Sequence, residues 1–267
     1  MTSNPTAPFG RRRCVVVSSR KVGAYVILEL ADRDGPPPSP GQFFMLTAGK
    51  GWGAGEDERP FLPRAFSAMG GHDGHLWFML EDVGPGTHRL AAMLKGEPVW
   101  VTGPLGIGFS SPEDGRRAVL CGGGIDLPPL VMWSRALAAD GVAPTLLLGF
   151  RDAAHAKVAD AFDAVQVATD DGSVGHDGLV TELLSAELDR DPHAVVYSCG
   201  PPGMLEAVRQ MCSERDIPAQ LALESGMACG FGACFGCVVP LSAGGYARVC
   251  IDGPVMAAAA VAEVPAH

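Results

Sequence analysis

The stretch CGFGACFGC, from Cys229 to Cys237, brings three cysteines together, and a fourth, Cys250, follows further along the chain. This C-x4-C-x2-C…C spacing is typical of a two-iron, two-sulfur cluster, whose irons need four thiolate ligands. Small residues between the cysteines let the loop turn sharply and bring backbone N–H groups close to sulfur. The pattern predicts that Cys229, Cys234, Cys237 and Cys250 bind a 2Fe-2S cluster, which indicates electron transfer.

Two other interpretations of these cysteines stay open, a zinc site and disulfide bonds. Zinc ligands usually come as two short C-x2-4-C pairs, whereas here a triplet is followed by one distant cysteine. The remaining cysteines stand singly in apolar or helical stretches, which is typical of reduced, buried thiols and not of a secreted disulfide framework. They are Cys14, Cys121, Cys199 and Cys212.

The composition excludes several classes of protein. No apolar run reaches the ~18 residues of a membrane span, and the start, MTSNPTAPFGRRRC, lacks the apolar core of a signal peptide. We therefore expect a cytoplasmic protein that does not enter a membrane. Its net charge of -10, from 30 acidic and 20 basic residues, offers no basic surface for nucleic acid.

The chain of 267 residues is long enough for two domains and a small appendage, and its pattern changes twice. Residues 1–108 carry short apolar runs separated by turn residues, which predicts an antiparallel β-barrel domain. Residues 109–223 alternate apolar strands with helical segments, which predicts a doubly wound α/β domain that binds a nucleotide at the carboxyl ends of its strands. Residues 224–267 would form a small 2Fe-2S module, so the expected fold class is α+β multidomain.

The ranges of these elements follow from the apolar pattern. The strands expected in the first domain are Cys14–Ser19, Ala24–Ala31, Phe43–Ala48, Arg64–Met69, His75–Leu80 and Pro98–Gly103. Those of the second are Ala118–Gly123, Thr145–Phe150, Val165–Asp170, Ala194–Gly200 and Gln220–Ser225. The helices expected between them are Pro128–Asp140, Ala156–Ala164, Leu179–Asp189 and Gly203–Arg215. Asp32–Gly41 and Gly49–Pro60 are rich in proline or glycine and predict long loops.

Two segments of the first domain suit an anionic cofactor. The arginine of Arg64–Ser67 lies on an expected strand after a proline-bounded loop, where a guanidinium can hold a pyrophosphate with two hydrogen bonds. An ordinary exposed strand arginine is the alternative. Gly84–Thr87 is a turn that leads into the helical run His88–Lys95, and a helix N-terminus favours an anion. Thr87 could equally be a plain helix cap.

Three further segments belong to the domain connection and the second domain. Gly103–Phe109 joins the two halves and reads as a flexible connection. Cys121–Pro129 contains a glycine-rich turn between strand and helix, where Gly122, Gly123 and Gly124 would hold a dinucleotide pyrophosphate. Ser198–Met204 ends a strand and opens a helix, and a nicotinamide could stack there. The residues expected at this second contact are Cys199, Gly200 and Pro201.

The order of these segments, ending in the cysteine loop, resembles the electron-transfer subunit of class 1B, NAD-dependent dihydroorotate dehydrogenase, in the ferredoxin reductase superfamily. The resemblance runs from about Cys14 to Met256. The matching stretches are RAFS, GPGT, GPLGIGF, GGGIDLPPL, ATDDGSVGHDGLVT, YSCGPPGML, ESGMACGFGACFGC and VCIDGP. ATDDGSVGHDG and the cysteine loop discriminate best, because general reductases of the superfamily lack that combination.

The resemblance implies a set of residues around FAD. Those expected to bind its pyrophosphate and flavin are Arg64, Ala65, Phe66 and Ser67. Those expected to line the adjoining strand are Met79, Leu80 and Glu81, and those expected to contact phosphate are Gly86 and Thr87. No catalytic side chain is assigned.

The resemblance also implies a function in pyrimidine biosynthesis. Dihydroorotate would reduce FMN in a separate catalytic subunit, and single electrons would cross the 2Fe-2S cluster to FAD, which passes hydride to NAD⁺. This chain would be the NAD-reducing half of a heterotetramer with two copies of each subunit. It would not itself oxidise dihydroorotate.

The chain departs from the family pattern at two positions. Asp126 stands where the family usually has glycine in GGGIG, and its carboxylate would occupy the anion site at the turn, so we expect Asp126 to weaken NAD binding. Gly226 stands where the family commonly has arginine, and the loss of a cation beside the cluster would lower the cluster's potential or alter a partner contact.

Two other functions remain open on the sequence alone. Related FAD and iron-sulfur subunits serve hydrogenases, sulfur reductases and ferredoxin-NADP transhydrogenases. The sequence alone does not exclude these functions, because the surface that discriminates between them belongs to the other subunit. The chain could also be a non-redox zinc-binding adaptor that kept the fold and lost the flavin, although the intact RAFS and GPGT segments argue against this alternative.

Overall fold

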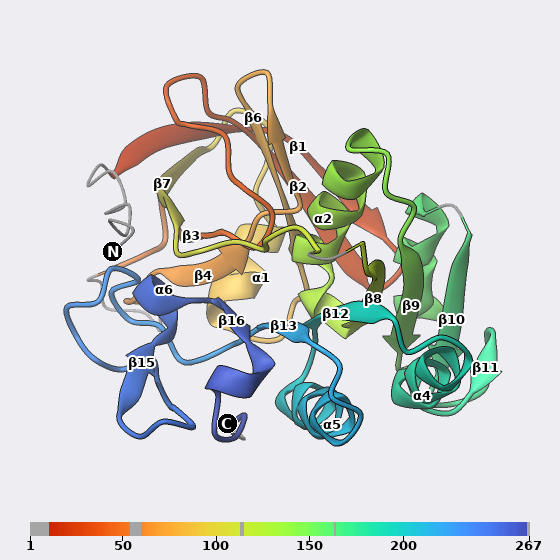
Figure 1. The fold of residues 1–267 in the computed structure, drawn as a ribbon. Helices are drawn as coiled ribbons and strands as arrows, with labels where there is room; N and C mark the ends of the chain where they lie inside the picture. The colour runs from red at the N-terminus through yellow and green to blue at the C-terminus, as the bar shows by residue number, and fades with distance from the viewer. Residues whose placement is uncertain (1–10, 54–59, 113–114, 163, 266–267) are drawn as a thin grey trace.

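The computed structural model describes residues 11–53, 60–112, 115–162 and 164–265. Figure 1 shows a curled sheet built from the first part of the chain, an α/β layer built from the middle, and a C-terminal segment that lies against both. Part of the expected loop Gly49–Pro60 lies outside the described residues.

The first part of the chain forms an antiparallel sheet with the strand order β4-β3-β7-β1-β2-β6-β5. Its strands are β1 (Arg12–Val22), β2 (Tyr25–Ala31), β3 (Phe43–Ala48), β4 (Arg64–Ser67), β5 (Gly70–His72), β6 (His75–Leu80) and β7 (Pro98–Leu105). Helix α1 (Pro85–Ala91) lies between β6 and β7 in the sequence. The expected antiparallel domain is confirmed, and β5 is a strand that the apolar pattern did not reveal, because two of its residues are glycines.

The second sheet has the order β11-β10-β9-β8-β12-β13-β16 and is parallel except at β16. Its strands are β8 (Arg117–Gly123), β9 (Thr145–Phe150), β10 (Val165–Thr169), β11 (His176–Asp177), β12 (Ala194–Cys199), β13 (Ala219–Ala222) and β16 (Val255–Ala257). The connecting helices are η1 (Gly124–Asp126), α2 (Pro128–Ala139), α3 (Ala153–Ala156), η2 (Lys157–Ala161), α4 (Val180–Arg190) and α5 (Pro202–Glu214). The expected doubly wound α/β domain is confirmed.

Helices cover both faces of this second sheet (Figure 1). Leu184 of α4 and Val208 of α5 belong to the same core as Leu147 and Val196 of the sheet. Helix α2 lies on the opposite face, and its Val131 packs with residues of the first sheet such as Ile27. Helix α2 therefore stands between the two sheets and fixes their relative position. Within the described part of the chain, no helix is long and apolar enough to cross a membrane.

The C-terminal segment contacts both sheets. It contains the hairpin β14 (Val238–Pro240) and β15 (Tyr246–Arg248), then α6 (Val249–Asp252), β16 and η3 (Ala258–Ala260). Strand β16 pairs with β13, while Ile107, just after β7, donates its N–H to Gly253 and accepts one from Val255. The connection Gly103–Phe109 is thus held by backbone hydrogen bonds to the C-terminal segment, in place of the flexible connection that its glycines suggest.

An ion pair closes one side of the first sheet. The guanidinium of Arg12 on β1 donates from Nε to Asp32 Oδ1 at 2.6 Å, and a second nitrogen donates to the Gly103 carbonyl at the end of β7. Asp32 is 5% exposed. A buried carboxylate is stabilised only by such partners, so the pair joins β1, the end of β2 and β7.

We expect Asp32→Ala to lower the free energy of unfolding by about 3 kcal/mol, because it leaves the Arg12 guanidinium without its buried partner. Urea unfolding followed by circular dichroism measures this change. The control is Asp160→Ala, which breaks a pair with Lys157 whose side chains are 63% and 65% exposed. Exposed pairs contribute little, so the control should unfold like the parent. An equal loss in both variants would contradict the assignment.

Candidate functional site

The cysteine loop depends on glycine where it packs on other elements. Gly230 has φ +79°, and a Cβ there would lie 2.6 Å from Cγ of Met45 on β3. Gly232 has φ +81°, and a Cβ there would lie 1.8 Å from Ile251 Cδ1. Both positions combine a left-handed backbone with a close approach that only glycine permits. The loop is therefore pressed onto the first sheet.

The four predicted cysteine ligands lie together as two pairs. Cys237 and Cys250 are buried with their sulfur atoms 3.1 Å apart. The Cys229 sulfur is hydrogen-bonded by the Cys234 side chain. Among the described residues, no three histidine, cysteine, aspartate or glutamate side chains converge on one point that could hold a metal ion. A 2Fe-2S cluster presents two irons that each take two cysteines, and this donor set fits two thiolate pairs.

Backbone N–H groups of the loop point at the Cys229 sulfur. Burial by itself would raise the pKa of this thiol. Hydrogen bonds from the backbone of Phe231, Ala233 and Cys234, together with the Cys234 side chain, outweigh burial and lower the pKa to about 7. The loop therefore favours a thiolate, which is the form that binds iron.

Arg64 and Gly86, from the two segments expected to bind FAD, lie against each other. Strand β4 ends the strand order of the first sheet, so its outer edge pairs with no other described strand. Arg64 at its start donates from Nη1 to the Leu62 carbonyl at 2.7 Å. A Cβ on Gly86 would lie 2.7 Å from Arg64 Nε, so the bare backbone of Gly86 makes room for the guanidinium. An open strand edge and an arginine beside a helix start fit a flavin dinucleotide.

The other residues expected around FAD have different surroundings. The Thr87 hydroxyl accepts N–H groups from Val83 and Gly84 and donates to the Gly84 carbonyl, each at 3.0 Å, so it caps α1. Met79 and Leu80 are buried, and their side chains belong to cores. Only their backbone can face a cofactor. The sequence could not separate a capping threonine from one that binds phosphate.

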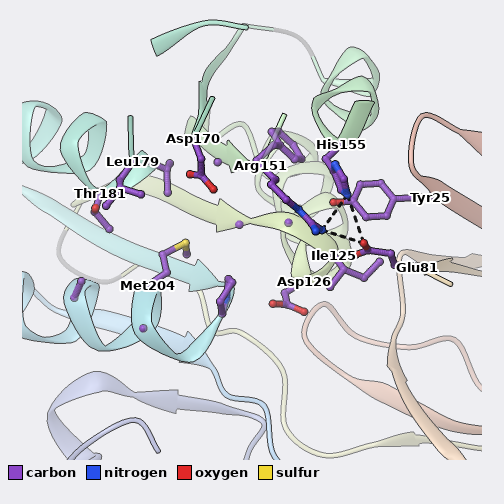
Figure 2. A pocket seen from close by; sticks show the side chains of 18 residues that line it. Tyr25, Glu81, Ile125, Asp126, Arg151, His155, Asp170, Leu179, Thr181 and Met204 are labelled. Atoms are coloured by element: carbon purple, nitrogen blue, oxygen red, sulfur yellow. Dashed lines mark hydrogen bonds and ion pairs between the residues drawn. The ribbon is translucent and has the colours of Figure 1, made fainter. Parts of the chain in front are cut away.

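A cavity of about 490 Å³ lies where the two sheets meet (Figure 2). It opens at the carboxyl ends of β8, β9 and β10 and beside the start of α5, and the first sheet closes one end with Tyr25 and Glu81. This position is the switch point of the α/β sheet, where β9 and β12 leave β8 in opposite directions. Dinucleotides bind at such crevices.

The predicted dinucleotide residues divide between the cavity wall and the core behind it. Gly123, Gly124 and Pro201 line the cavity. A Cβ on Gly123 would lie 2.8 Å from Met204 Sδ and 3.1 Å from Pro201 Cδ, so the two predicted nucleotide segments touch. The other three lie behind the wall. Gly122 packs against Leu127, Gly200 packs against Met204, and Cys199 is buried, with the pKa of its thiol well above the usual value because of that burial.

One end of the cavity carries a polar cluster around Glu81, which was expected beside FAD, but the sequence did not reveal its partners. Glu81 Oε1 accepts a hydrogen bond from Arg151 Nη2 at 3.1 Å and lies 3.4 Å from His155 Nε2. Tyr25 is fully buried, and its hydroxyl points toward this cluster without a hydrogen-bond partner among the described residues (Figure 2). Asp170 lines the cavity near its far end and directly follows β10. Its place at a strand end and inside the stretch ATDDGSVGHDG were the available signals.

Asp126 is a second acidic residue of the cavity wall. Asp126 lines the cavity, and its pKa is raised to about 9, first by burial, then by the charge and hydrogen bond of Glu224, and last by the charge of Glu81. Glu224 follows β13 and was not predicted as a site residue. Gly226, the second departure, is exposed, and a Cβ there would meet no atom within 4 Å. Packing therefore does not require glycine at that position.

Comparisons with known sequences agree with this arrangement. A family model described as the iron-sulfur cluster binding domain of dihydroorotate dehydrogenase B matches residues 224–262. A relative from Bacillus caldolyticus is 38% identical, with 95% of this chain and 99% of the relative covered. One from Caldanaerobacter subterraneus is 33% identical, with 90% and 94% covered. Both are named dihydroorotate dehydrogenase B (NAD(+)), electron transfer subunit.

Solved structures share the fold. An NADH-dependent reduced ferredoxin-NADP oxidoreductase matches with a TM-score of 0.80 at 24% identity, over 95% of this chain and 91% of that chain. Phthalate dioxygenase reductase matches with a TM-score of 0.62 at 17% identity, over 96% of each chain. The expected combination of a curled antiparallel sheet and an α/β sheet is thus found in known structures. The C-terminal iron-sulfur segment is supported by the family model over residues 224–262.

We expect Gly86→Ala to weaken FAD binding about tenfold, because the new methyl group pushes Arg64 aside and removes one charge-assisted hydrogen bond. The flavin-to-protein ratio after purification and an FAD titration of the apoprotein measure the effect. Gly84→Ala is the matched control, since its backbone is extended and a Cβ there meets nothing within 4 Å. Equal flavin retention by both variants would show that Arg64 does not hold FAD.

Proposed function

Because this chain belongs to the family of the electron transfer subunits of dihydroorotate dehydrogenase B, we propose that it relays electrons from dihydroorotate oxidation in an FMN-containing partner subunit to NAD⁺. The relay uses a 2Fe-2S cluster, which carries one electron at a time, and FAD, which exchanges two electrons as hydride with NAD⁺. The observation that carries the proposal is that four cysteines lie together as two pairs in a segment that packs against the first sheet. The pathway served is pyrimidine biosynthesis.

The cysteines take the cluster pairwise in this proposal. Cys229 and Cys234 hold one iron, while Cys237 and Cys250 hold the other. The loop N–H groups that lower the pKa of Cys229 also donate toward the sulfur atoms, which stabilises the negative charge of the bound thiolates. The contact of Gly230 with Met45 keeps the cluster against the strands expected to bind FAD.

Arg64 and the open edge of β4 position FAD. The guanidinium binds the pyrophosphate, and Gly86 lets it reach the start of α1. The cavity between the sheets takes NAD⁺, with the backbone of Gly123 and Gly124 beside the pyrophosphate and Pro201 beside the nicotinamide. Both dinucleotides then lie where the two halves of the chain meet.

Exposed apolar side chains around the cysteine loop support a partner surface there. Phe235, Val238 and Tyr246 are 63%, 37% and 73% exposed. The Arg248 guanidinium lies 5.1 Å from the centre of the Phe235 ring and donates to the Gly232 carbonyl, so the hairpin and the loop form one face. Clustered exposed apolar residues mark interaction sites. We propose that the FMN subunit docks on this face and that two copies of each chain form a heterotetramer.

The remaining cysteines support a reducing compartment. Cys14, Cys121, Cys199 and Cys212 are buried thiols without disulfide partners. Such thiols are typical of cytosolic proteins. We propose a cytoplasmic location on this ground.

The absorption spectrum of the anaerobically purified protein, with iron, sulfide, zinc and flavin analysis, tests the relay. We expect FAD and two irons per chain, and both should be bleached by NADH. Flavin and iron that ignore NADH would point to another acceptor. Zinc without flavin would overturn the proposal in favour of a structural adaptor.

Replacing a cluster ligand should separate the two halves of the relay. We expect Cys250→Ser to lose iron and sulfide and to abolish electron transfer from the FMN partner, while NADH oxidation with an artificial two-electron acceptor persists through FAD. Iron analysis and the two activity assays measure this. Cys212→Ser changes a buried thiol in α5 and should keep its iron. Full iron content in Cys250→Ser would remove Cys250 from the ligand set.

The partner surface gives a separate prediction. We expect Val238→Ser to weaken binding of the FMN subunit about fivefold through lost apolar contact. Val174→Ser is the matched control, since Val174 is 40% exposed and lies in the segment between β10 and β11, outside the hairpin and the cysteine loop. Surface plasmon resonance with the purified partner measures both. Equal affinities would place the interface elsewhere.

A further inference from the structure

The cavity between the sheets has two chemically different ends (Figure 2). Tyr25 and Glu81 stand together at one end, and of the described residues that line the cavity they are the two from the first part of the chain. Asp170 and Thr181 stand toward the other end and belong to the α/β domain. The cavity therefore meets the first sheet at the end that holds Tyr25 and Glu81.

The end beside the first sheet is the place for the nicotinamide ring. Hydride transfer requires the reacting atoms of nicotinamide and flavin to lie roughly 3–3.5 Å apart. FAD is expected on the first sheet, where Glu81 follows β6 and the chain then runs to Gly86, which packs against Arg64. This placement rests on the proposed function, in which the cavity takes NAD⁺ and the first sheet holds FAD.

His155 at this end is held as a neutral ring by its two neighbours. Its Nδ1 lies 2.7 Å from Asp152 Oδ1, so Nδ1 donates to the carboxylate and carries the ring proton. Its Nε2 lies 3.0 Å from Arg151 Nη2. A guanidinium nitrogen can only donate, so Nε2 is the acceptor. This tautomer is assigned from the hydrogen-bond partners, and it leaves His155 fully occupied in holding Arg151.

The hydrogen-bonding capacity of this end is only partly used. Arg151 Nη2 bridges His155 Nε2 and Glu81 Oε1, while the other N–H groups of Arg151 and the second oxygen of Glu81 bond to none of the described residues. The hydroxyl of Tyr25 is fully buried, points toward this cluster and has no partner in the described part of the chain (Figure 2). Donors and an acceptor therefore stand side by side without partners.

A primary amide is the group that suits this combination. Its carbonyl oxygen accepts hydrogen bonds and its NH₂ group donates them. A phosphate group only accepts, and the carboxylate of Glu81, which also neutralises Arg151, would repel it. The nicotinamide ring carries one primary amide, the carboxamide, so the chemistry of this end agrees with its place beside the first sheet.

We propose that Tyr25 and Glu81 bind the carboxamide of the nicotinamide ring. The Tyr25 hydroxyl donates to the carbonyl oxygen, and the Glu81 carboxylate accepts from the NH₂ group. Arg151 and His155 are positioning residues, because His155 holds Arg151 and Arg151 holds Glu81. Arg151 is 65% exposed and is held through one nitrogen, so it can shift as the amide enters. Two contacts at the carboxamide fix the rotation of the ring relative to the flavin.

Two fully buried tyrosines, Tyr25 and Tyr197, give a matched test. Tyr25→Phe removes a hydroxyl that has no partner among the described residues, so it should weaken NAD⁺ binding about fivefold without lowering the melting temperature. Tyr197→Phe removes a hydroxyl that donates to the Ser110 carbonyl at 3.0 Å, so it should lower the melting temperature and leave NAD⁺ affinity unchanged. Calorimetric titration of the oxidised, FAD- and cluster-loaded protein and thermal unfolding measure the two effects.

Two dinucleotide analogues test the other contact. In 3-acetylpyridine adenine dinucleotide a methyl group replaces the amide NH₂, and the parent protein should bind it about tenfold more weakly than NAD⁺, because the Glu81 carboxylate loses its donor. Glu81→Ala should bind both dinucleotides equally well. Asp170→Asn changes another carboxylate of the cavity wall and should keep the tenfold preference. Nicotinamide hypoxanthine dinucleotide is altered only in its adenine, and Glu81→Ala should not change its affinity relative to NAD⁺.

The outcomes separate this inference from the proposed function. Unchanged NAD⁺ affinity in Tyr25→Phe, or a tenfold preference that survives in Glu81→Ala, would overturn the carboxamide site alone. A preference between NAD⁺ and the hypoxanthine analogue that disappears in Glu81→Ala would place adenine at this end and would also overturn it. No NAD⁺ binding by the loaded parent protein would overturn both the carboxamide site and the proposed use of the cavity.

Discussion

The close packing of the cysteine loop on strand β3 is the constraint on which the arrangement of the molecule depends. A side chain at position 230 would collide with Met45, and one at position 232 would collide with Ile251. The loop therefore fits against its neighbours in only one position. To reach it, the chain must leave β13, cross to the first sheet and return as β16 beside β13. Val255 of the returning strand donates its N–H to the Ile107 carbonyl in the connection after β7, and the Gly253 carbonyl just before the strand accepts the N–H of Ile107. The C-terminal segment therefore holds the two sheets together and also carries the four cysteines that are predicted to bind the cluster.

The polar contacts of the cavity show the same joining of distant segments. Glu81, which follows strand β6 of the first sheet, accepts a hydrogen bond from Arg151 and lies beside His155, and both of these follow strand β9 of the second sheet. Asp152 caps α3, and its Oδ1 lies 2.7 Å from His155 Nδ1, which orients the imidazole ring. Arg151 is 65% exposed, so its pair with Glu81 is weak and water can compete for it. Apolar packing of Ile27 and Met79 on Val131 supplies the stronger attachment. The polar cluster therefore sets the charge of the cavity more than it holds the domains in place.

Local patterns predicted most of the fold and the residues that act through local geometry. Strands such as β3 and β12 are buried along their whole length, and their apolar runs were plain in the sequence. The cysteine pattern and the glycine turn of β8 also depend on spacing within a few residues. What escaped prediction depends on tertiary contacts. Strand β16 has three residues and exists because β13 offers an edge, and Tyr25 reaches the cavity from the start of an ordinary apolar strand. Thr87 shows that even a recognised motif does not fix the role of each residue, because a threonine that caps a helix and one that binds phosphate occur in the same sequence.

Asp126 shows why charge is harder to read from sequence than fold. A carboxyl group at a glycine-rich turn reads as an anion that competes with pyrophosphate, because sequence gives the side chain its usual ionisation. Burial raises the pKa of this carboxyl group to about 9, and the charge of Glu224, which is far away in the chain, acts in the same direction. The segment after β13, which leads to the cysteine loop, therefore also brings a second carboxyl group near the first. The charge of the cavity and the position of the cysteine loop therefore depend on the same chain path.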